Sequence, residues 1–217
     1  IFYIKNGANL MTQNKHKFIL ASASPRRREL LDAAGIRYSQ HPANIDEVRM
    51  EHESPTEYSL RNASSKAKAV SEKLPLPDIA EIIIAADTIV VQGTDVFEKP
   101  LSTEQAGLML SQLSGESHQV ITAVSLLRRY VDKGQLCDTE IHSFATITDV
   151  EFKDLKPEEI QRYIIEAKVM DKAGAYAAQG NGGYIIKSLR GSYTNVIGLP
   201  MAEVMEALKT IFGIEIY

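Results

Sequence analysis

The sequence predicts an α/β fold, in which helices flank a twisted mixed β-sheet. Three observations support this prediction: a short apolar strand that leads into a helix near the start, a long apolar strand in the middle of the chain, and two long strands joined by a tight turn. Alternating strands and helices combined with an antiparallel hairpin are typical of a mixed sheet covered by helices.

The first unit combines a strand with a helix that starts on a proline. Residues 17–21 form a short apolar run, Ser24 is a good helix N-cap, and Pro25 fits the first helical position. Gly35 follows the last apolar residues and is typical of a helix end. We therefore expect a buried strand followed by a helix over residues 25–34.

The strongest strand signal lies in the middle of the chain. Residues 79–91 read IAEIIIAADTIVV, a nearly continuous apolar run that indicates burial on both faces. A helix over about residues 56–73 precedes this run, because Ser54 and Pro55 supply a start signal and Pro75 follows its end.

The rest of the chain continues the alternation around a hairpin turn at residues 132–134. The elements that we expect there are a helix over 102–113, strands over 118–131 and 138–152, a helix over 156–167, a strand over 184–189 and a helix over 199–212.

Composition limits the classes of function. The 217 residues carry a formal net charge of −4. We therefore do not expect the protein as a whole to attract nucleic acid electrostatically, and any site for an anion must depend on a local group of positive charges. Cys137 is the single cysteine, which excludes an internal disulfide and a cysteine zinc cluster and fits a reducing compartment. No run approaches the roughly 20 apolar residues of a membrane span.

The chain divides into a short extension and one domain. Residues 1–10 precede Met11 and lack the charge and apolar order of a secretory signal. We expect them to be an upstream or added extension outside the fold. Residues 11–217 are expected to form a single α/β domain.

Three adjacent arginines open the first expected helix. Arg26, Arg27 and Arg28 fall at the positive end of the helix dipole, where each cation costs roughly 0.3–1 kcal/mol. One interpretation is a solvated basic helix start. The other is an anion site, in which backbone N–H groups, guanidinium groups and the neighbouring Ser22 receive a phosphate. The glycines of a P-loop are missing, and these residues alone leave both interpretations open.

Asp87 interrupts the long apolar strand. An ionised carboxylate in such a run needs a partner, a metal ion or an opening to solvent. It either caps a local turn at the strand end, or it is a metal ligand or base at an edge of the sheet, where open α/β sheets bind ligands. Asp46 and Glu47 lie in a polar segment and could supply a second carboxylate, although such pairs are usually solvated.

Other segments carry candidate ligand-binding groups. Lys66 and Lys68 lie on different faces of an expected helix, so at most one of them points at a site. Lys99 stands before a proline, which favours an extended backbone. Each lysine also fits a solvated surface. Residues 171–183 are rich in glycine and alanine, which suits either a flexible loop or close approach of backbone to a ligand, and His118 is expected to be structural.

Six segments follow one another in a specific order between Phe18 and Phe212: SASPRRRELL, AADTIVV, EKP, LSGESHQVITAV, DKAGAYAAQG and GSYTNVIGLP. In this order they resemble the Maf family of nucleoside triphosphate pyrophosphatases, also described as septum-formation inhibitor-like proteins. One segment alone would carry little weight, whereas six in order are highly specific. The resemblance implies two lobes of the α/β fold around a nucleotide-binding cleft.

The resemblance also implies a reaction, a cofactor and partners. A hydrolase of this family cuts a nucleoside triphosphate between the α and β phosphates and releases the monophosphate and pyrophosphate. The form KAGAYAAQG, with Gln179, resembles the branch that acts on dTTP and UTP. The family further implies a divalent cation (magnesium or manganese), a homodimer and a cytoplasmic location, with neither nucleic acid nor a membrane as partner.

Site residues carry over from the family position by position. Asp87 matches the general base, and Glu47 and Asp87 match the carboxylates linked to the metal ion. The positions matched for binding the substrate are Ser22, Arg26, Arg27, Lys66, Lys99, Thr88 and Gln179, of which Arg26, Thr88 and Gln179 match the positions associated with base selection. Arg28 and Glu98 depart from the family's usual pattern.

Two other classes of function compete with this interpretation. A nucleotide-binding regulatory protein of cell division would need no catalysis, but a pure binding protein has no need of a buried base such as Asp87. A nucleic-acid binder using Arg26, Arg27 and Arg28 is disfavoured by the negative net charge and by the lack of a basic face studded with aromatic residues.

Overall fold

A single mixed sheet runs through the protein in a computed structural model that describes residues 16–216; the expected extension of residues 1–10 lies outside them. The strands are β1 (Lys17–Leu20), β2 (Tyr38–Gln40), β3 (Glu81–Gln92), β4 (Asp95–Phe97), β5 (Ser117–Asp132), β6 (Gln135–Phe152) and β7 (Ile186–Arg190). Their order is β2-β1-β3-β5-β6-β7, with β4 paired to β3. Strand β1 is parallel to β2 and β3, and all other pairs are antiparallel, which confirms the predicted mixed sheet.

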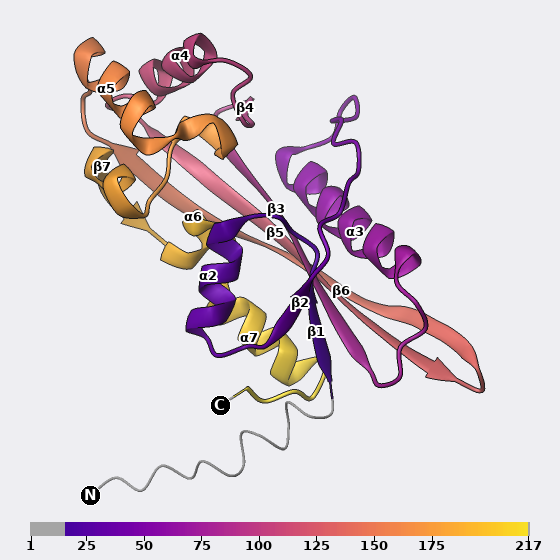
Figure 1. Cartoon of the computed structure of the whole chain (residues 1–217). Coiled ribbons are helices and arrows are strands. Elements are labelled where there is room, and N and C mark those ends of the chain that lie inside the picture. Colours follow the sequence, from indigo (N-terminus) through magenta and orange to yellow (C-terminus); the bar gives the residue numbers. More distant parts are fainter. Residues whose placement is uncertain (1–15, 217) are drawn as a thin grey trace, which may run out of the picture.

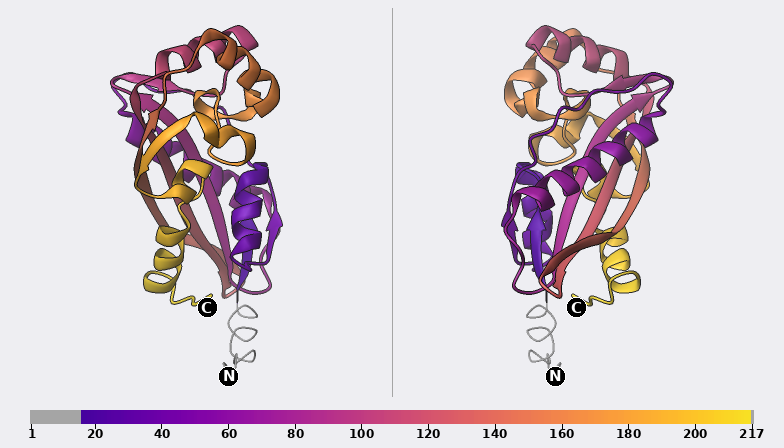
Figure 2. Two further views of the ribbon diagram at one scale, coloured as in Figure 1. Left: turned by 90° about the vertical axis from the view of Figure 1, so that its left-hand side faces the viewer. Right: turned by 90° about the vertical axis from the view of Figure 1, so that its right-hand side faces the viewer.

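Helices cover both faces and one end of this sheet (Figures 1 and 2). They are α2 (Pro25–Ala33), α3 (Pro55–Lys73), α4 (Thr103–Leu113), α5 (Pro157–Ala167), α6 (Tyr193–Ile197) and α7 (Met201–Thr210), with 3-10 helices η1 (Val169–Asp171), η2 (Ala173–Ala175) and η3 (Gly180–Ile185). Within the described part of the chain, no helix is long and apolar enough to cross a membrane.

Alternation along β3 assigns each of its side chains to one face of the sheet. Ile82 and Ile84 pack in a core with α2 and α7, whereas Ile83 and Ala85 pack in a core with α3. Because side chains alternate with period two in a strand, the same rule sends the next residues to opposite faces. Asp87 accordingly contacts α3, and Thr88 contacts a side chain of α2.

A second core fills the other end of the molecule, where α4 and α5 lie far from α7 (Figure 2). It includes Leu110 of α4, Tyr163 of α5 and Val90 of β3. The long strands β3, β5 and β6 are common to both ends. The structure therefore has the two expected halves, and one sheet joins them.

Where the two halves meet, one edge of β3 lacks a paired strand. The β1–β3 pairing ends at Leu20 and Ile84, and the β3–β4 pairing begins at Val90 and Phe97. Between them, residues 85–89 have no strand neighbour on that edge in the described chain, because the chain turns from β1 into α2. Asp87 and Thr88 lie in this gap in the strand pairing.

The local sequence signals were mostly correct. Helix α3 begins with a capping box, in which Ser54 and Glu57 bond each other's backbone N–H groups, and Gly35 has the positive φ of 67° typical of a helix end. The Ser24 side chain, however, accepts no bond from α2; its backbone N–H donates to Ser22 Oγ at 3.2 Å. The expected strand over 184–189 begins later, at Ile186, because η3 takes up the preceding residues.

Candidate functional site

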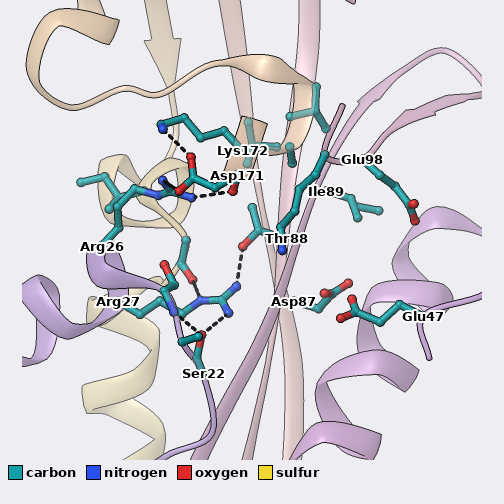
Figure 3. Close-up of a pocket in the computed structure, with 18 of the residues that line it drawn as sticks. Ser22, Arg26, Arg27, Glu47, Asp87, Thr88, Ile89, Glu98, Asp171 and Lys172 are labelled. Atoms are coloured by element: carbon teal, nitrogen blue, oxygen red, sulfur yellow. Dashed lines mark hydrogen bonds and ion pairs between the residues drawn. The ribbon is translucent and has the colours of Figure 1, made fainter. Parts of the chain in front are cut away.

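A cavity of about 630 Å³ lies over the gap in β3 pairing. Its walls come from the N-terminal end of α2, the segment 42–47, helix α3, strand β3, the segment 98–101 and the segments 171–179 and 196–198. All nine residues expected from the sequence line it: Ser22, Arg26, Arg27, Glu47, Lys66, Asp87, Thr88, Lys99 and Gln179. The fold thus brings together residues that are separated by more than half of the chain (Figure 3).

Arg27 is fixed in the floor of the cavity by three neutral oxygen atoms. Its Nε donates to the carbonyl oxygen of Gly198 at 2.8 Å, Nη1 donates to Ser22 Oγ at 3.0 Å and Nη2 donates to Thr88 Oγ1 at 3.0 Å (Figure 3). Burial lowers the pKa of the guanidinium to about 10, so it stays charged at neutral pH. A half-buried cation whose partners are neutral favours an anionic ligand.

Arg26 lies at the rim of the cavity and bridges α2 to η1. Its Nη1 donates to Asp171 Oδ2 at 3.0 Å and its Nη2 to the Asp171 carbonyl oxygen at 3.3 Å. The Lys172 ammonium donates to the other oxygen of the same carboxylate at 2.6 Å. Burial would raise the pKa of Asp171, but Lys172 and Arg26 outweigh burial and hold it below its ordinary value. Arg28, the third arginine, is exposed and does not line the cavity.

Two carboxylates and a lysine form a cluster on the opposite side of the cavity. Lys66 Nζ donates to Asp87 Oδ1 at 2.6 Å and to Glu47 Oε2 at 2.9 Å. Burial would raise the pKa of Asp87, but the Lys66 ammonium, its hydrogen bond to Asp87 and the Arg27 charge hold that pKa below its ordinary value. Asp87 is therefore ionised at neutral pH, in a buried position where a carboxylate can accept a proton.

The segment that carries Lys99 is tied to the segment that carries Glu47. The buried Tyr58 hydroxyl of α3 contacts the carbonyl oxygen of Glu47 at 3.0 Å and the carboxylate of Glu98. Burial and the Glu98 carboxylate raise the pKa of Tyr58, so its hydroxyl stays protonated. Lys99 is exposed and lines the cavity, which leaves its ammonium accessible to a ligand.

Thr88 and Gln179 lie in different walls. Thr88 Oγ1 accepts from Arg27 and lies 3.0 Å from Thr122 Oγ1, so it already holds the arginine in place. Gln179 is half-buried at the end of the segment 171–179 that lines the cavity. An amide has a donor and an acceptor, which suits the edge of a nucleobase.

The sequence did not reveal some residues that lie in the cavity or directly behind it. Asp171 and Lys172 stand in the quoted segment DKAGAYAAQG, but their ion pairs with each other and with α2 depend on the tertiary fold. Tyr58 and Asn62 precede Lys66 at intervals of four residues, a spacing that places all three on one face of α3. That spacing was the sequence signal from which Tyr58 and Asn62 could have been predicted to lie near Lys66.

A divalent cation fits the carboxylate cluster by its chemistry. Glu47 and Asp87 converge on one point, the Lys66 ammonium, and magnesium prefers such hard oxygen ligands. Among the described residues, no group of three or more histidine, cysteine, aspartate and glutamate side chains could enclose an ion. A magnesium ion held by these two carboxylates would take its other ligands from substrate oxygens and water.

The comparisons with known proteins give the family. The family model described as "Maf-like protein" matches residues 17–211. The chain belongs to this family. A Geobacter sulfurreducens relative named "dTTP/UTP pyrophosphatase" is 42% identical over 91% of this chain and 97% of its own. A Syntrophomonas wolfei relative of the same name is 44% identical over 85% of this chain and 92% of its own.

A solved structure gives a more distant likeness. It is the "Nucleoside-triphosphatase / dITP/XTP pyrophosphatase" from Mycobacterium abscessus, which is 14% identical, covers 91% of this chain and 94% of its own, and has a TM-score of 0.33. This likeness is too distant to support an inference. The family assignment depends on the sequence matches alone. Each of the six segments quoted from the sequence contributes residues to the walls of the cavity.

Proposed function

We propose that this Maf-like protein is a nucleoside triphosphate pyrophosphatase that hydrolyses dTTP and UTP, and modified pyrimidine nucleotides, to the monophosphate and pyrophosphate. The names of its relatives support this proposal. The observation that carries it is the cavity, which combines the half-buried cation Arg27 on one side with the ionised carboxylate Asp87 on the other. A phosphate chain and an attacking water molecule need these two kinds of group.

The cationic side of the cavity receives the triphosphate. Arg27 is prepositioned by three hydrogen bonds, while Arg26 and Lys99 reach the cavity from α2 and from the segment after β4. Lys66 Nζ adds a further positive charge close to the carboxylates. These groups offset the charge that builds on the pyrophosphate leaving group, because fixed cations act where charge develops.

Asp87 orients the attacking water and accepts its proton. Its buried carboxylate is held ionised by Lys66, so it is ready to act as a general base at neutral pH. A divalent metal ion, magnesium or manganese, would be held by Glu47 and Asp87. When bound, it would neutralise phosphate charge.

Base selection is assigned to the wall that contains Gln179, together with Thr88 and Arg26. The amide of Gln179 can donate to one atom and accept from another on the edge of a pyrimidine. We also expect this protein to be a homodimer in the cytoplasm, as the family resemblance implies.

The competing function is a nucleotide-binding regulatory protein without significant catalysis. The two proposals differ in what Asp87→Asn does. We expect this variant to lose about 10²–10⁴-fold in the rate of pyrophosphate release, because a general base contributes that much. Binding of a non-hydrolysable α,β-imido analogue of dTTP, measured by calorimetry, should stay within a few-fold of the wild type.

Thermal unfolding of the same variant serves as the folding control. A wild type that binds the analogue but releases no pyrophosphate would favour the regulatory protein. An Asp87→Asn variant with full turnover would remove Asp87 from the mechanism.

A further inference from the structure

Helix α3 presents three polar side chains to the site from one face. Tyr58, Asn62 and Lys66 are four residues apart and buried, and each contacts the carboxylate region of the cavity. Residues at this interval stack above one another on a helix. Lys66 and Tyr58 line the cavity, whereas Asn62 lies behind it and does not.

Asn62 contacts the carboxylate that the proposed reaction uses. Its Nδ2 donates to Asp87 Oδ2 at 3.3 Å, while Lys66 Nζ donates to Asp87 Oδ1 at 2.6 Å. The two donors come from successive turns of one rigid helix, and each holds one oxygen of the carboxylate. Together they fix both the position of Asp87 and the rotation of its carboxylate plane.

Burial of Asn62 has a cost that packing does not explain. The side chain is 0% exposed, and its Oδ1 has no hydrogen-bond partner among the described residues. An unsatisfied buried acceptor lowers the stability of a fold, whereas an apolar side chain of similar shape has no such group to satisfy. Among the described residues, the Asn62 amide interacts with two side chains: its hydrogen bond with the Tyr58 hydroxyl lowers the pKa of that tyrosine, and it donates to the Asp87 carboxylate. A role in orienting that carboxylate accounts for a polar residue here.

We propose that Asn62 is a positioning residue for Asp87: its buried amide holds Asp87 Oδ2 so that the carboxylate keeps one orientation toward the attacking water. This inference rests on the proposed function, in which Asp87 is the base. Asn62 itself touches no substrate, since it does not line the cavity. Without the amide, Lys66 alone would hold the carboxylate, which could then rotate about its Cβ–Cγ bond.

The first test separates kcat from KM. Asn62→Leu keeps the branched shape and the number of side-chain heavy atoms and removes the amide, so we expect kcat for dTTP to fall about 10-fold while KM stays within about twofold, because orientation acts on the chemical step. The matched control is Ser59→Ala, which removes another buried polar group from α3, whose hydroxyl donates to the helix's own Thr56 carbonyl. This control should keep wild-type kcat. An unchanged kcat in a folded Asn62→Leu variant would overturn the proposal.

The second test needs neither a variant of Asn62 nor turnover. In the wild type, a hydrogen bond to a carboxylate should move one side-chain amide proton of Asn62 downfield in an NMR spectrum. We expect that proton to shift in Asp87→Asn and to keep its position in Ser59→Ala. An Asn62 amide signal that Asp87→Asn leaves unchanged would overturn the positioning role, even in an active enzyme.

The two tests also distinguish this inference from the proposed function. If the wild type releases no pyrophosphate while the Asn62 signal responds to Asp87→Asn, the proposed function fails and Asn62 still orients Asp87. If the wild type releases pyrophosphate and the Asn62 amide signal does not respond to Asp87→Asn, the proposed function is supported and the positioning role of Asn62 is refuted.

Discussion

Arg27 is half-buried in the cavity, where its environment differs from that of an ordinary surface arginine. All of its hydrogen-bond partners are neutral, and they lie on three different segments: Ser22, Thr88 and Gly198. A planar guanidinium can serve three acceptors at once, whereas an ammonium on a flexible stem cannot reproduce that geometry. The charge would therefore remain in a lysine variant while its position would be lost.

We expect Arg27→Lys to lower kcat/KM for dTTP by about 10–100-fold, because the phosphate would meet a misplaced cation. The measurement is the initial rate of pyrophosphate release over a range of dTTP concentrations. Arg28→Lys is the matched control: Arg28 belongs to the same arginine run but is exposed outside the cavity. Equal losses in the two variants would contradict the assignment of Arg27 to the phosphate.

His118 gives a prediction about stability and pH. Its ring is buried edge-on against Phe152 and Tyr176, and Nε2 pairs with the Tyr176 hydroxyl at 2.8 Å. Burial lowers the pKa of His118 from its ordinary value of 6.5 to about 4. Between these values the unfolded chain binds more protons than the folded one, so stability is complete above pH 6.5 and is lost as the pH falls.

The expected loss from this residue between pH 7 and pH 5 is about 2 kcal/mol in the free energy of unfolding. Urea unfolding at the two pH values measures it. His118→Gln keeps a side chain that can bond the Tyr176 hydroxyl but cannot titrate, so its stability should change less over the same interval. A His118→Gln variant with the same pH dependence as the wild type would show that other groups cause the loss.

At the scale of elements, the segment 171–183 has a backbone that is held in one conformation, and its residues up to Gln179 line the cavity. Tyr163 of α5 accepts a bond from the Ala177 N–H at 3.1 Å, and the Gly174 N–H donates to the Glu98 carbonyl oxygen at 3.1 Å. Ala175, a residue with a side chain, has a positive φ of 58°. Such a backbone persists only where its surroundings hold it, which favours a shaped binding wall over the flexible-loop alternative.

Two glycines of this segment allow a matched comparison. Gly174 has φ +64°, and an added Cβ would lie 2.9 Å from Val90, whereas Gly180 has φ +60° and no atom within 4 Å of such a Cβ. Alanine should cost about 1–2 kcal/mol at either site through backbone strain, and about 1–3 kcal/mol more at Gly174 through the clash. Calorimetry should therefore place the Tm of Gly174→Ala at least about 2 °C below that of Gly180→Ala. Equal Tm values would mean that β3 does not hold the segment in place.

Elements with local signals were predictable from the sequence. Helix α3 was placed by Ser54 and Pro55, and β3 by its apolar run, because capping and strand burial depend on neighbouring residues. Contacts between distant residues were not predictable in this way. Arg26 and Asp171 are 145 positions apart, and no local pattern shows that they pair.

At the scale of the whole molecule, the candidate site lies where one continuous sheet joins the two halves of the protein. The strand β3 runs from the core that contains α2 and α7 to the core that contains α4 and α5. Its residues 85–89, which have no strand neighbour on one edge in the described chain, lie between these two cores. The arginines come from one half and the segment 171–179 from the other. The residues that the family resemblance named line one cavity, whereas the hydrogen bonds of Asn62 and Tyr58 follow from the packing of α3 on the sheet.

The most direct test of the proposed function is pyrophosphate release by the purified wild type from dTTP, UTP, dCTP, dATP, dGTP and GTP, each with magnesium and with EDTA. We expect release that requires the metal ion and is fastest with dTTP and UTP, together with the matching nucleoside monophosphates as products. Folded protein that releases no pyrophosphate from any of these nucleotides would contradict it.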